Sequence, residues 1–292
     1  MSPDYPREKR PSNVRHLQRV VSAAASAKGV VPGRMQYWLS TMALLGALER
    51  SNDCRKEQRR GLLLKGGVAI ELRLGIKART TKDVDFVFYG HLDALLEDLD
   101  RAFAKPHSGF DFERGGPQKI RDTGSYRFDV KIYYGEKRQP WQTLQVEVSP
   151  SEIDPLESDE VPAISIEDLG LSGPKTVRCL SLRYQIAQKI HACTERIENR
   201  ENDRSRDLID LILLRDLVDD LASVREACVI TFERRERHAW PPELTIEPSW
   251  PEVYTAEAKR YGFDVEAVED AARLVRAFIA ATDAASRPAA SR

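Results

Sequence analysis

The chain has 292 residues, of which 41% are hydrophobic and 31% are charged, so it can build a substantial core and is not disordered. No stretch approaches the roughly 18 apolar residues of a membrane-spanning helix, and the N-terminus MSPDYPREKR lacks the apolar region of a secretory signal. The cysteines, Cys54, Cys179, Cys193 and Cys228, lie far apart, which favours reduced thiols over disulfides or a zinc site. We therefore expect a cytoplasmic protein.

The net charge of −1 hides an uneven distribution along the chain. Residues 1–92 carry 17 Lys and Arg against 8 Asp and Glu, whereas the remainder carries 28 against 38. A basic first third is typical of proteins that bind nucleic acid or another polyanion. The alternative interpretation is that the two parts neutralise each other across a domain interface.

Hydrophobic periodicity predicts mixed elements in the first half of the chain and helices in the second. The first-half elements are, in chain order, a helical stretch over 14–48, a buried strand over 62–67 running into a glycine turn, a helix over 68–75, a strand over 83–89, a helix over 91–103 and a run of strands over 108–149. The predicted second-half helices cover 181–199, 205–221, 223–237, 252–261 and 265–282. The segment 238–254, rich in Pro and Trp, interrupts them because two adjacent prolines cannot lie inside a helix.

Residues 151–174 are acidic and contain three prolines, which predicts a loop and a boundary between subdomains. We therefore divide the chain into a basic N-terminal helical region (1–60), a core of strands and helices (61–150) and a mainly helical C-terminal region (151–292). Charged or small residues at both ends indicate frayed termini.

The most informative stretch is KGGVAIELRLGIKARTTKDVDF at 65–86. Side chains two residues apart on a strand share a face, so Asp83 and Asp85 point the same way and Val84 points the other way. Two such carboxylates are suitable ligands for Mg²⁺, which also binds substrate phosphates. The pair Gly66-Gly67 lets the backbone approach a phosphate, and amides at the start of the following helix favour negative charge.

Glu147, in the strand LQVEVSP, is our candidate for a third metal ligand, with Val146 and Val148 on the opposite face. Such a site suits phosphoryl or nucleotidyl transfer by two metal ions roughly 3.5–4 Å apart. Taken singly, a D-x-D pair is often only solvated and a glycine pair is often only a tight turn. Their occurrence together, in this order, favours function. Neither the P-loop motif nor the dinucleotide-binding glycine motif is present.

A second group of charged residues lies on the predicted helices at 181–217. Lys189 borders an apolar stripe, and Asp207 and Asp210 share one face of a helix that is apolar nearly all round. A buried carboxylate is costly unless it is paired, and Lys189 or Arg204 is a suitable partner. One interpretation is a structural salt bridge between helices. The other is that Lys189 contacts a nucleotide triphosphate and Asp207 or Asp210 orients it, and both can hold together.

In these motifs the chain resembles the AbiEii/AbiGii group of nucleotidyltransferase toxins, and most closely the mycobacterial MenT toxins. The shared stretches are KGG-x-x-x-ELR-x-GI, RT-x-KD-x-D, the later VEVS strand, QIAQK-x-HA, ND-x-x-x-DL-x-DL and the Trp/Pro segment HAWPP…WP-x-x-Y. The resemblance covers about residues 12–282. It implies an α+β fold, in which a DNA polymerase β-like nucleotidyltransferase core at 61–150 is followed by a helical region that completes the active site.

The resemblance also implies an activity. A toxin of a toxin–antitoxin system would transfer a nucleotide from an NTP, preferably a pyrimidine, to the 3′ acceptor end of tRNA, which blocks aminoacylation and translation. The implied cofactor is Mg²⁺ or Mn²⁺, and the implied partners are the NTP, the tRNA acceptor stem and a cognate antitoxin. We expect a monomer that does not bind membranes.

The resemblance assigns roles to individual residues. Asp83 and Asp85 would bind the metal ions, with Glu147 as a weaker third ligand, and Lys189 and Asp210 would be the essential helical pair. The nucleotide would be bound by Lys65, Gly66 and Gly67 at the glycine turn, by Thr81 before the D-x-D strand and by Asp207 on the later helix. Thr81 occupies a position where some relatives have a hydroxyl that is phosphorylated for regulation. Val68 and Ala69 depart from the family, since many relatives have Ser or Thr after the glycine pair.

Other residues have a structural and a functional interpretation. His191 faces away from Lys189, which favours a structural role. His238 and Trp240 would stack on a base or, more simply, pack against the core. The basic run Arg55, Lys56, Arg59 and Arg60 is either a solvated loop or a phosphate contact. Two alternative functions stay open: nucleotide transfer to a protein hydroxyl, and a non-catalytic binding module with this fold.

Overall fold

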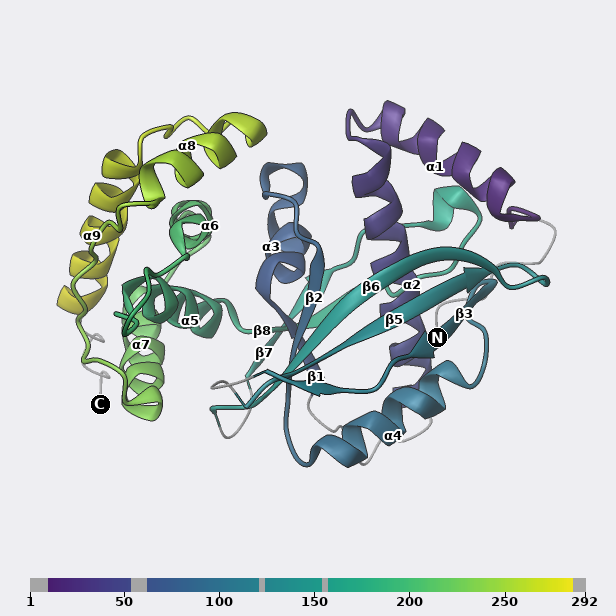
Figure 1. Ribbon diagram of the computed structural model, residues 1–292, viewed down its shortest axis with the longest axis horizontal. Coiled ribbons are helices and arrows are strands. Elements are labelled where there is room, and N and C mark those ends of the chain that lie inside the picture. The colour runs from purple at the N-terminus through teal and green to yellow at the C-terminus, as the bar shows by residue number, and fades with distance from the viewer. Residues whose placement is uncertain (1–9, 54–61, 121–123, 154–156, 286–292) are drawn as a thin grey trace, which may run out of the picture. The chain divides into compact units, whose positions relative to one another are not determined.

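The computed structural model describes residues 10–53, 62–120, 124–153 and 157–285 (Figure 1). Contacts divide the chain into two compact units. The first comprises Met1–Ile76 and Thr80–Leu180, and the second comprises Lys77–Arg79 and Ser181–Arg292. The first unit contains a mixed β-sheet with helices and the second is helical, which confirms the predicted α+β fold.

The first unit is built on one sheet, whose strands follow the order β3-β5-β6-β2-β1-β8-β7, with β4 paired to β5. The strands are β1 (Leu62–Lys65), β2 (Asp83–Phe88), β3 (Phe110–Arg114), β4 (Gln118–Lys119), β5 (Tyr126–Tyr134), β6 (Gln139–Pro150), β7 (Ser158–Pro162) and β8 (Thr176–Leu180). The central strand β2 runs antiparallel to β1 and parallel to β6. The sheet is therefore mixed at the position where the sequence places its paired aspartates.

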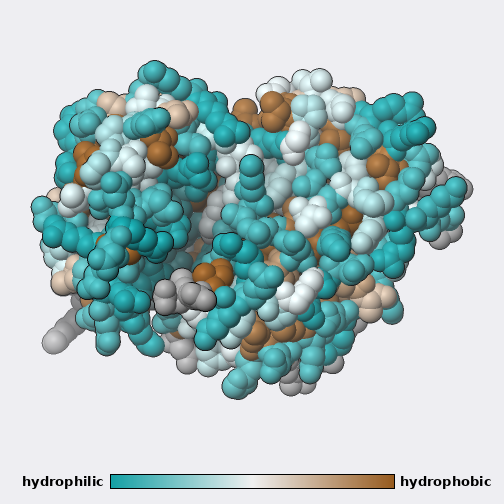
Figure 2. All heavy atoms as spheres, in the orientation of Figure 1, coloured by the Kyte–Doolittle hydropathy of each residue, from teal (hydrophilic) through white to brown (hydrophobic). Residues whose placement is uncertain are grey.

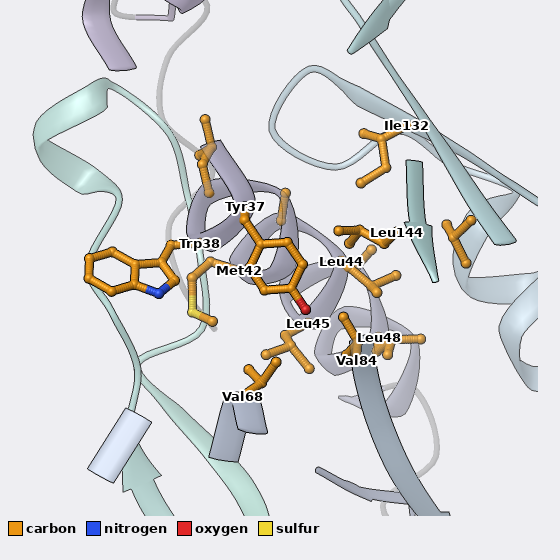
Figure 3. Close-up of a cluster of buried hydrophobic side chains, with 14 of the residues drawn as sticks. Tyr37, Trp38, Met42, Leu44, Leu45, Leu48, Val68, Val84, Ile132 and Leu144 are labelled. Atoms are coloured by element: carbon orange, nitrogen blue, oxygen red, sulfur yellow. The ribbon is translucent and has the colours of Figure 1, made fainter. Parts of the chain in front are cut away.

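Apolar residues alternate along these strands and bury one face of the sheet. On β2, Val84 is fully buried while its neighbours Asp83 and Asp85 are only partly buried. The helices α2 (Pro32–Asp53) and α4 (Leu92–Phe103) contribute to the same core, as Figure 3 shows for Tyr37, Leu44 and Leu48 of α2 beside Val84. This packing leaves the opposite face of β2 and β6 for polar side chains.

The helical pattern at 14–48 forms two helices, not one. The first is α1 (Val14–Ala27), and α2 begins at Pro32. Gly29 adopts a φ of +65°, which ends the first helix, and Pro32 suits the first position of the second. In α1 the stripe Leu17, Val21 and Ala25 is buried.

The glycine pair belongs to the helix that follows it. Helix α3 (Gly66–Leu74) begins at Gly66, two residues before the predicted start, and Gly75 ends it with a φ of +64°. A short 3₁₀ turn, η2 (Gly75–Lys77), then leads into the polar loop before β2. The predicted end at Gly75 is thus confirmed.

The predicted loop at 151–174 is wrong in part, because β7 and the later β8 extend the sheet. Strand β7 lies at an edge of the sheet and buries only Val161. Its acidic sequence therefore lacks the alternating apolar residues by which a strand is predicted. The short 3₁₀ helix η3 (Glu167–Leu169) lies between the two strands. The structure therefore differs from the predicted division into 1–60, 61–150 and 151–292, since α2 and both strands share the first unit.

The second unit consists of five helices within the described residues, close to those predicted. They are α5 (Leu182–Thr194), α6 (Ser205–Arg215), α7 (Leu221–Arg235), α8 (Trp250–Tyr261) and α9 (Val268–Ala284). Helix α6 ends at Arg215, before the predicted end at residue 221. A separate helix, α7, begins after Asp220, whose side chain accepts a hydrogen bond from the amide of Ala222 at 2.9 Å. The Pro/Trp segment lies between α7 and α8, as predicted.

His191 is buried at the contact of α5 and α7. Its ring packs against Phe232 and His238, with centroid distances of 4.9 and 4.5 Å. Trp240 packs edge-on against Phe232 and donates a hydrogen bond from Nε1 to Asp283. These contacts support the structural interpretation of His191 and the packing interpretation of the Pro/Trp segment.

Hydrophilic side chains dominate the face shown in Figure 2, with hydrophobic residues scattered among them. The large hydrophobic residues exposed in the described chain are Val31, Ile76, Tyr89, Leu217 and Val253. None of the described helices has the length and apolar character needed to cross a membrane. The described cysteines, Cys179, Cys193 and Cys228, are buried and unbridged, and burial raises the pKa of each thiol.

We expect Val84→Ala to lower the free energy of unfolding by about 1.5–3 kcal/mol, because two buried methyl groups are lost and a small cavity remains. The matched control is Val31→Ala, since Val31 is 67% exposed and Val84 is fully buried. The control should change stability by less than about 0.5 kcal/mol. Urea denaturation measures both, and equal effects of the two variants would contradict the proposed core.

Stability should also depend on pH through His191. Burial, followed by the charge of Arg235, lowers the pKa of His191 from 6.5 to about 3. The pKa of His191 is lower in the folded state than in the unfolded state. The contribution of His191 to the free energy of unfolding is therefore complete above about pH 6.5 and is lost as the pH falls toward 3. We expect the difference in unfolding free energy between wild type and His191→Leu to shrink by up to about 1.4 kcal/mol per pH unit in that window. A pH-independent difference in urea titrations would contradict this.

Candidate active site

Strand β2 presents Asp83 and Asp85 on one face of the sheet, as the sequence predicts. The burial pattern along the strand alternates, with both aspartates partly exposed and Val84 buried between them. On the neighbouring strand β6, Glu147 is partly exposed between the buried Val146 and Val148. The three carboxylates therefore belong to the polar face opposite the core.

The strand register aligns four charged residues in one row across the sheet. Asp85 lies opposite Lys65 on β1 and opposite Glu147 on β6, and Glu147 lies opposite Arg127 on β5. The row thus consists of two carboxylates between two cations. This confirms the predicted pairing of the Glu147 strand with the Asp83–Asp85 strand.

The glycine pair brings the backbone against these side chains. A Cβ atom on Gly66, whose φ is +64°, would lie 2.1 Å from Oδ2 of Asp85. A Cβ atom on Gly67 would lie 2.6 Å from Cβ of Thr81. A side chain at either position would force Asp85 or Thr81 to shift, and the start of α3 lies beside both residues.

Lys65 occupies the N-cap position of α3 without capping the helix through its side chain. Its Nζ atom instead donates a hydrogen bond to Oγ of Ser149 at 3.0 Å. The Ser149 hydroxyl also bonds with that of Ser125, at 2.8 Å. The two serines thus hold the ammonium group on the polar face, beside the start of α3, where a helix N-terminus favours negative charge.

Glu147 forms an ion pair with Arg127, with 3.2 Å between the carboxylate and Nη2. Both side chains are partly exposed, at 26% and 46%, so the pair contributes little stability and can exchange partners readily. Thr81 donates a weak hydrogen bond from Oγ1 to the carbonyl of Asp83 at 3.4 Å. The polar face therefore combines acidic, basic and hydroxyl groups around the glycine pair.

The second predicted group forms a buried ionic network in the helical unit. Nζ of Lys189 donates to Asp207 and to Asp210, at 2.7 Å in each case. Arg79 makes a two-pronged contact with the carboxylate of Asp210, from Nε at 3.0 Å and from Nη2 at 2.8 Å. All four side chains are at most 17% exposed. Two cations and two carboxylates balance each other in this network.

The pKa values in the network favour its charged form. Burial by itself lowers the pKa of Lys189, but Asp207 and Asp210 outweigh burial and raise it. Burial by itself raises the pKa of Asp210, but Lys189 and Arg79 outweigh it and lower the value. Burial likewise opposes the charge of Arg79, yet Asp210 raises its pKa. The network is an ion-pair cluster and not a set of neutral groups.

The structure selects one of the two expected partners and adds others. Lys189 pairs with both aspartates as predicted, whereas the guanidinium of Arg204 forms an ion pair with Asp203, at 3.9 Å. Sequence reasoning missed Arg79, although it is the first residue of the shared stretch RT-x-KD-x-D. It also missed Ser149, two residues after Glu147 on the same strand face. The basic run Arg55, Lys56, Arg59 and Arg60 lies outside the described residues.

Comparison with known proteins supports the family resemblance. Residues 48–281 match the model of the AbiEii family, described as the nucleotidyl transferase AbiEii toxin of a type IV toxin–antitoxin system. The chain belongs to this family. It is thus a nucleotidyltransferase toxin of a toxin–antitoxin system, a class that has a nucleotide substrate and a cognate antitoxin. No curated protein gives a significant match to the sequence.

One solved structure shows the same fold, and two others are weaker matches. The nucleotidyltransferase toxin MenT4 from Mycobacterium tuberculosis is 19% identical, with a TM-score of 0.55 over 91% of this chain and 98% of MenT4. An antigenic nucleotidyltransferase-like protein from Paracoccidioides brasiliensis is 18% identical, with a TM-score of 0.40 over 77% of this chain and 91% of its own. The antibiotic-resistance factor ANT(2'')-Ia is 17% identical, with a TM-score of 0.39 over 68% of this chain and 99% of its own. At these identities MenT4 shows the fold of this toxin and nothing finer.

The close approach at Gly66 yields a prediction with a matched control. Gly66→Ala and Gly29→Ala both place a side chain at a φ near +65°, but a Cβ atom on Gly29 meets nothing within 4 Å. We expect Gly66→Ala to lower the unfolding free energy by at least about 1 kcal/mol more than Gly29→Ala, because its methyl group overlaps the Asp85 carboxylate. Urea denaturation measures both variants. Adding Asp85→Ala to Gly66→Ala should recover part of the loss, and no recovery would contradict the contact.

Proposed function

We propose that this toxin transfers a nucleotide from an NTP to the 3′ acceptor end of tRNA, using the polar face of β2 and β6. The observation that carries the proposal is the position of Asp83 and Asp85 on one face, beside Glu147 and against the glycine pair. The tRNA acceptor and a preference for a pyrimidine NTP come from the resemblance to the MenT toxins. We expect the toxin to act in the cytoplasm as a monomer. Modified tRNA could not be aminoacylated, so translation would stop.

A divalent cation fits the donor set of this face. Asp83 and Asp85 are two carboxylates on one side of a strand, and Mg²⁺ is commonly held by one or two carboxylates together with substrate phosphates. Within the described chain no three His, Cys, Asp or Glu side chains form a ready-made metal cluster. Asp83 and Asp85 would therefore hold Mg²⁺ or Mn²⁺ with the triphosphate, and Glu147 would join after leaving Arg127. The metal would neutralise phosphate charge and favour ionisation of the attacking hydroxyl.

The residues around the glycine pair would bind the triphosphate. Lys65 supplies a positive charge that Ser149 holds on this face, and the start of α3 supplies backbone amides close to Asp85. Val68 and Ala69 are buried and have no hydroxyl, so the phosphate contacts would come from the backbone and from Lys65. Catalysis would rest mainly on positioning and charge neutralisation.

In the transfer itself, the 3′ oxygen of the RNA forms a bond to the α-phosphorus. The bond between that phosphorus and the bridging oxygen to the β-phosphate breaks, and pyrophosphate leaves with the electron pair. The proton of the 3′ hydroxyl passes to a carboxylate of the face or to water.

The acid-free stretch 9–48 contains Arg15, Arg19 and Lys28, which are exposed and would attract the RNA backbone.

We expect Asp83→Asn to lower nucleotidyl transfer at least about 10²-fold, because it removes a carboxylate that neutralises charge in the transition state. The control is Asp129→Asn, which changes an exposed aspartate on the same face of the sheet, on β5. The assay is incubation with Mg²⁺, each labelled NTP and purified tRNA, followed by gel analysis. Total protein is offered in parallel. Label on protein alone would replace tRNA by a protein acceptor, and equal transfer by both variants would refute the site.

Lys189→Ala is a poor test of the same proposal. Lys189 is 11% exposed and holds two carboxylates, so its removal would leave buried charge unpaired at a cost of about 3–5 kcal/mol. Loss of toxicity in that variant would report unfolding as much as catalysis. Asp83 is partly exposed and Asp129 is exposed, so their amide variants should fold.

A further inference from the structure

The charged row on the polar face ends in Arg127. Strands β5, β6 and β2 are neighbours in the sheet unit (Figure 1), and the register places Arg127 opposite Glu147 and Glu147 opposite Asp85. Neighbouring strands are about 4.8 Å apart, so the backbones at Arg127 and Asp85 are roughly 10 Å apart. Arg127 is therefore close to the acids, on the side of β2 that faces away from β1.

The ion pair of Arg127 is a weak one. Its Nη2 atom makes a single hydrogen bond to Glu147 at 3.2 Å, and the two side chains are 46% and 26% exposed. In contrast, Arg114 of the same sheet unit meets both oxygens of Asp100, at 3.0 and 2.6 Å, and is 14% exposed. An exposed pair with one hydrogen bond contributes little stability. Arg127 can therefore exchange its partner readily.

The proposed function fixes the side from which the acceptor arrives. In it, the triphosphate lies at the glycine pair, which follows β1 and approaches Asp85. The attacking and leaving oxygens of a phosphoryl transfer lie roughly in line, on opposite sides of the phosphorus. Pyrophosphate would leave toward the glycine pair, so the 3′ hydroxyl would approach from the side of β6 and β5.

Strand β5 presents three charged side chains on this side. Arg127, Asp129 and Lys131 are exposed and alternate with buried residues, so they share the polar face. Asp129 would repel a phosphate. Lys131 is four residues from Arg127, or roughly 13 Å along the strand. Among the described side chains of β5, Arg127 is thus the cation closest to the row of Glu147 and Asp85.

Glu147 links the two halves of the reaction site. In the proposed function it leaves Arg127 to join the metal, and the guanidinium then loses the partner described for it. A guanidinium can bind a phosphate through two parallel hydrogen bonds. In the acceptor RNA, the phosphodiester between the last two nucleotides lies one sugar away from the reacting 3′ hydroxyl. That phosphodiester is the anion that would arrive beside Arg127.

We propose that Arg127 binds the terminal phosphodiester of the acceptor RNA and that Glu147 masks it in the free toxin. The inference rests on the proposed function, since it takes the acids as the reaction centre and RNA as the acceptor. It adds a substrate contact on the acceptor side, whereas the glycine pair serves the NTP. The contacts that carry it all lie within the sheet unit.

RNA binding without metal tests the masking. The Kd of labelled tRNA is measured by fluorescence anisotropy in EDTA at low salt. Glu147→Gln should tighten binding, because an amide holds Arg127 less strongly than a carboxylate does. The matched control is Asp129→Asn, which removes the same charge from an exposed position on the same face.

We expect the Kd of Glu147→Gln to be at least about threefold lower than that of Asp129→Asn, since a charge-assisted contact becomes available in the first variant only. Adding Arg127→Gln to Glu147→Gln should abolish this difference. Equal Kd values for Glu147→Gln and Asp129→Asn, or a difference that survives the loss of Arg127, would overturn the proposal.

Steady-state kinetics with Mg²⁺ test the contact itself. We expect Arg127→Gln to raise KM for tRNA about tenfold, while KM for the NTP changes less than about threefold. The dependence of log KM for tRNA on log salt concentration should lose roughly one unit of slope, because one phosphate contact is lost. Arg127→Lys should fall between wild type and Arg127→Gln, since it keeps the charge and loses the paired hydrogen bonds.

The matched control for the kinetics is Arg178→Gln. Arg178 is a partly exposed arginine of β8, beyond β1 and thus on the opposite side of the acids, and it donates to Oγ of Ser158 at 3.3 Å. Both of its KM values should stay within about twofold of wild type. A raised KM for the NTP alone in Arg127→Gln would assign Arg127 to the triphosphate and overturn the proposal, as would two unchanged KM values.

The outcomes separate this inference from the proposed function. If wild type neither binds nor modifies tRNA, the proposed acceptor is wrong and the role of Arg127 is refuted with it. If wild type modifies tRNA and Arg127→Gln does so with the same KM and salt dependence, the proposed function stands and this inference alone is refuted. Melting temperatures of the variants check that each is folded, since the exposed pair should contribute little to stability.

Discussion

The backbone at Gly66 lies so close to the Asp85 carboxylate that no side chain fits between them, and the polar face depends on this approach. A Cβ atom there would lie 2.1 Å from an Asp85 oxygen. The contact brings the start of α3, with its partial positive charge, beside an acid on the central strand. The register of β1, β2 and β6 then sets Lys65 and Glu147 on either side of that acid.

The two groups of acidic residues differ in their exposure to water and in their charged partners. On the sheet, the carboxylates are partly exposed, and Glu147 has an easily exchanged partner in Arg127. In the helical unit, Asp210 is 1% exposed and is saturated by Lys189 and Arg79. A partly solvated acid can bind a cation and a substrate that arrive from water, whereas a buried and saturated acid holds structure together. This contrast separates the acids that we expect to bind a metal and a substrate from those whose contacts stabilise the helical unit.

The core explains why the polar face can exist at all. Val84, Val146 and Val148 are buried on the opposite side of the same strands, where α2 and α4 contribute to the core. Since strand side chains alternate, each buried valine fixes the direction of its acidic neighbours. Packing and chemistry are therefore set by the same register, and a slip of one residue would bury the acids.

Local pattern in the sequence was enough to predict most helices, the D-x-D strand, the shared face of Asp83 and Asp85 and the third acid at Glu147, because alternation and glycine turns are short-range signals. It was also enough to indicate the family through several motifs in order. Only the tertiary structure decided that α2 and the strands β7 and β8 belong with the sheet, and that Arg79 and Ser149 are partners of Asp210 and Lys65. The pairs Arg79–Asp210 and Lys65–Ser149 are 131 and 84 residues apart, and no local periodicity reports contacts over such separations. A buried charge is costly unless it is paired, so Asp210 and the ammonium group of Lys65 are stabilised by whichever polar side chains the fold brings next to them.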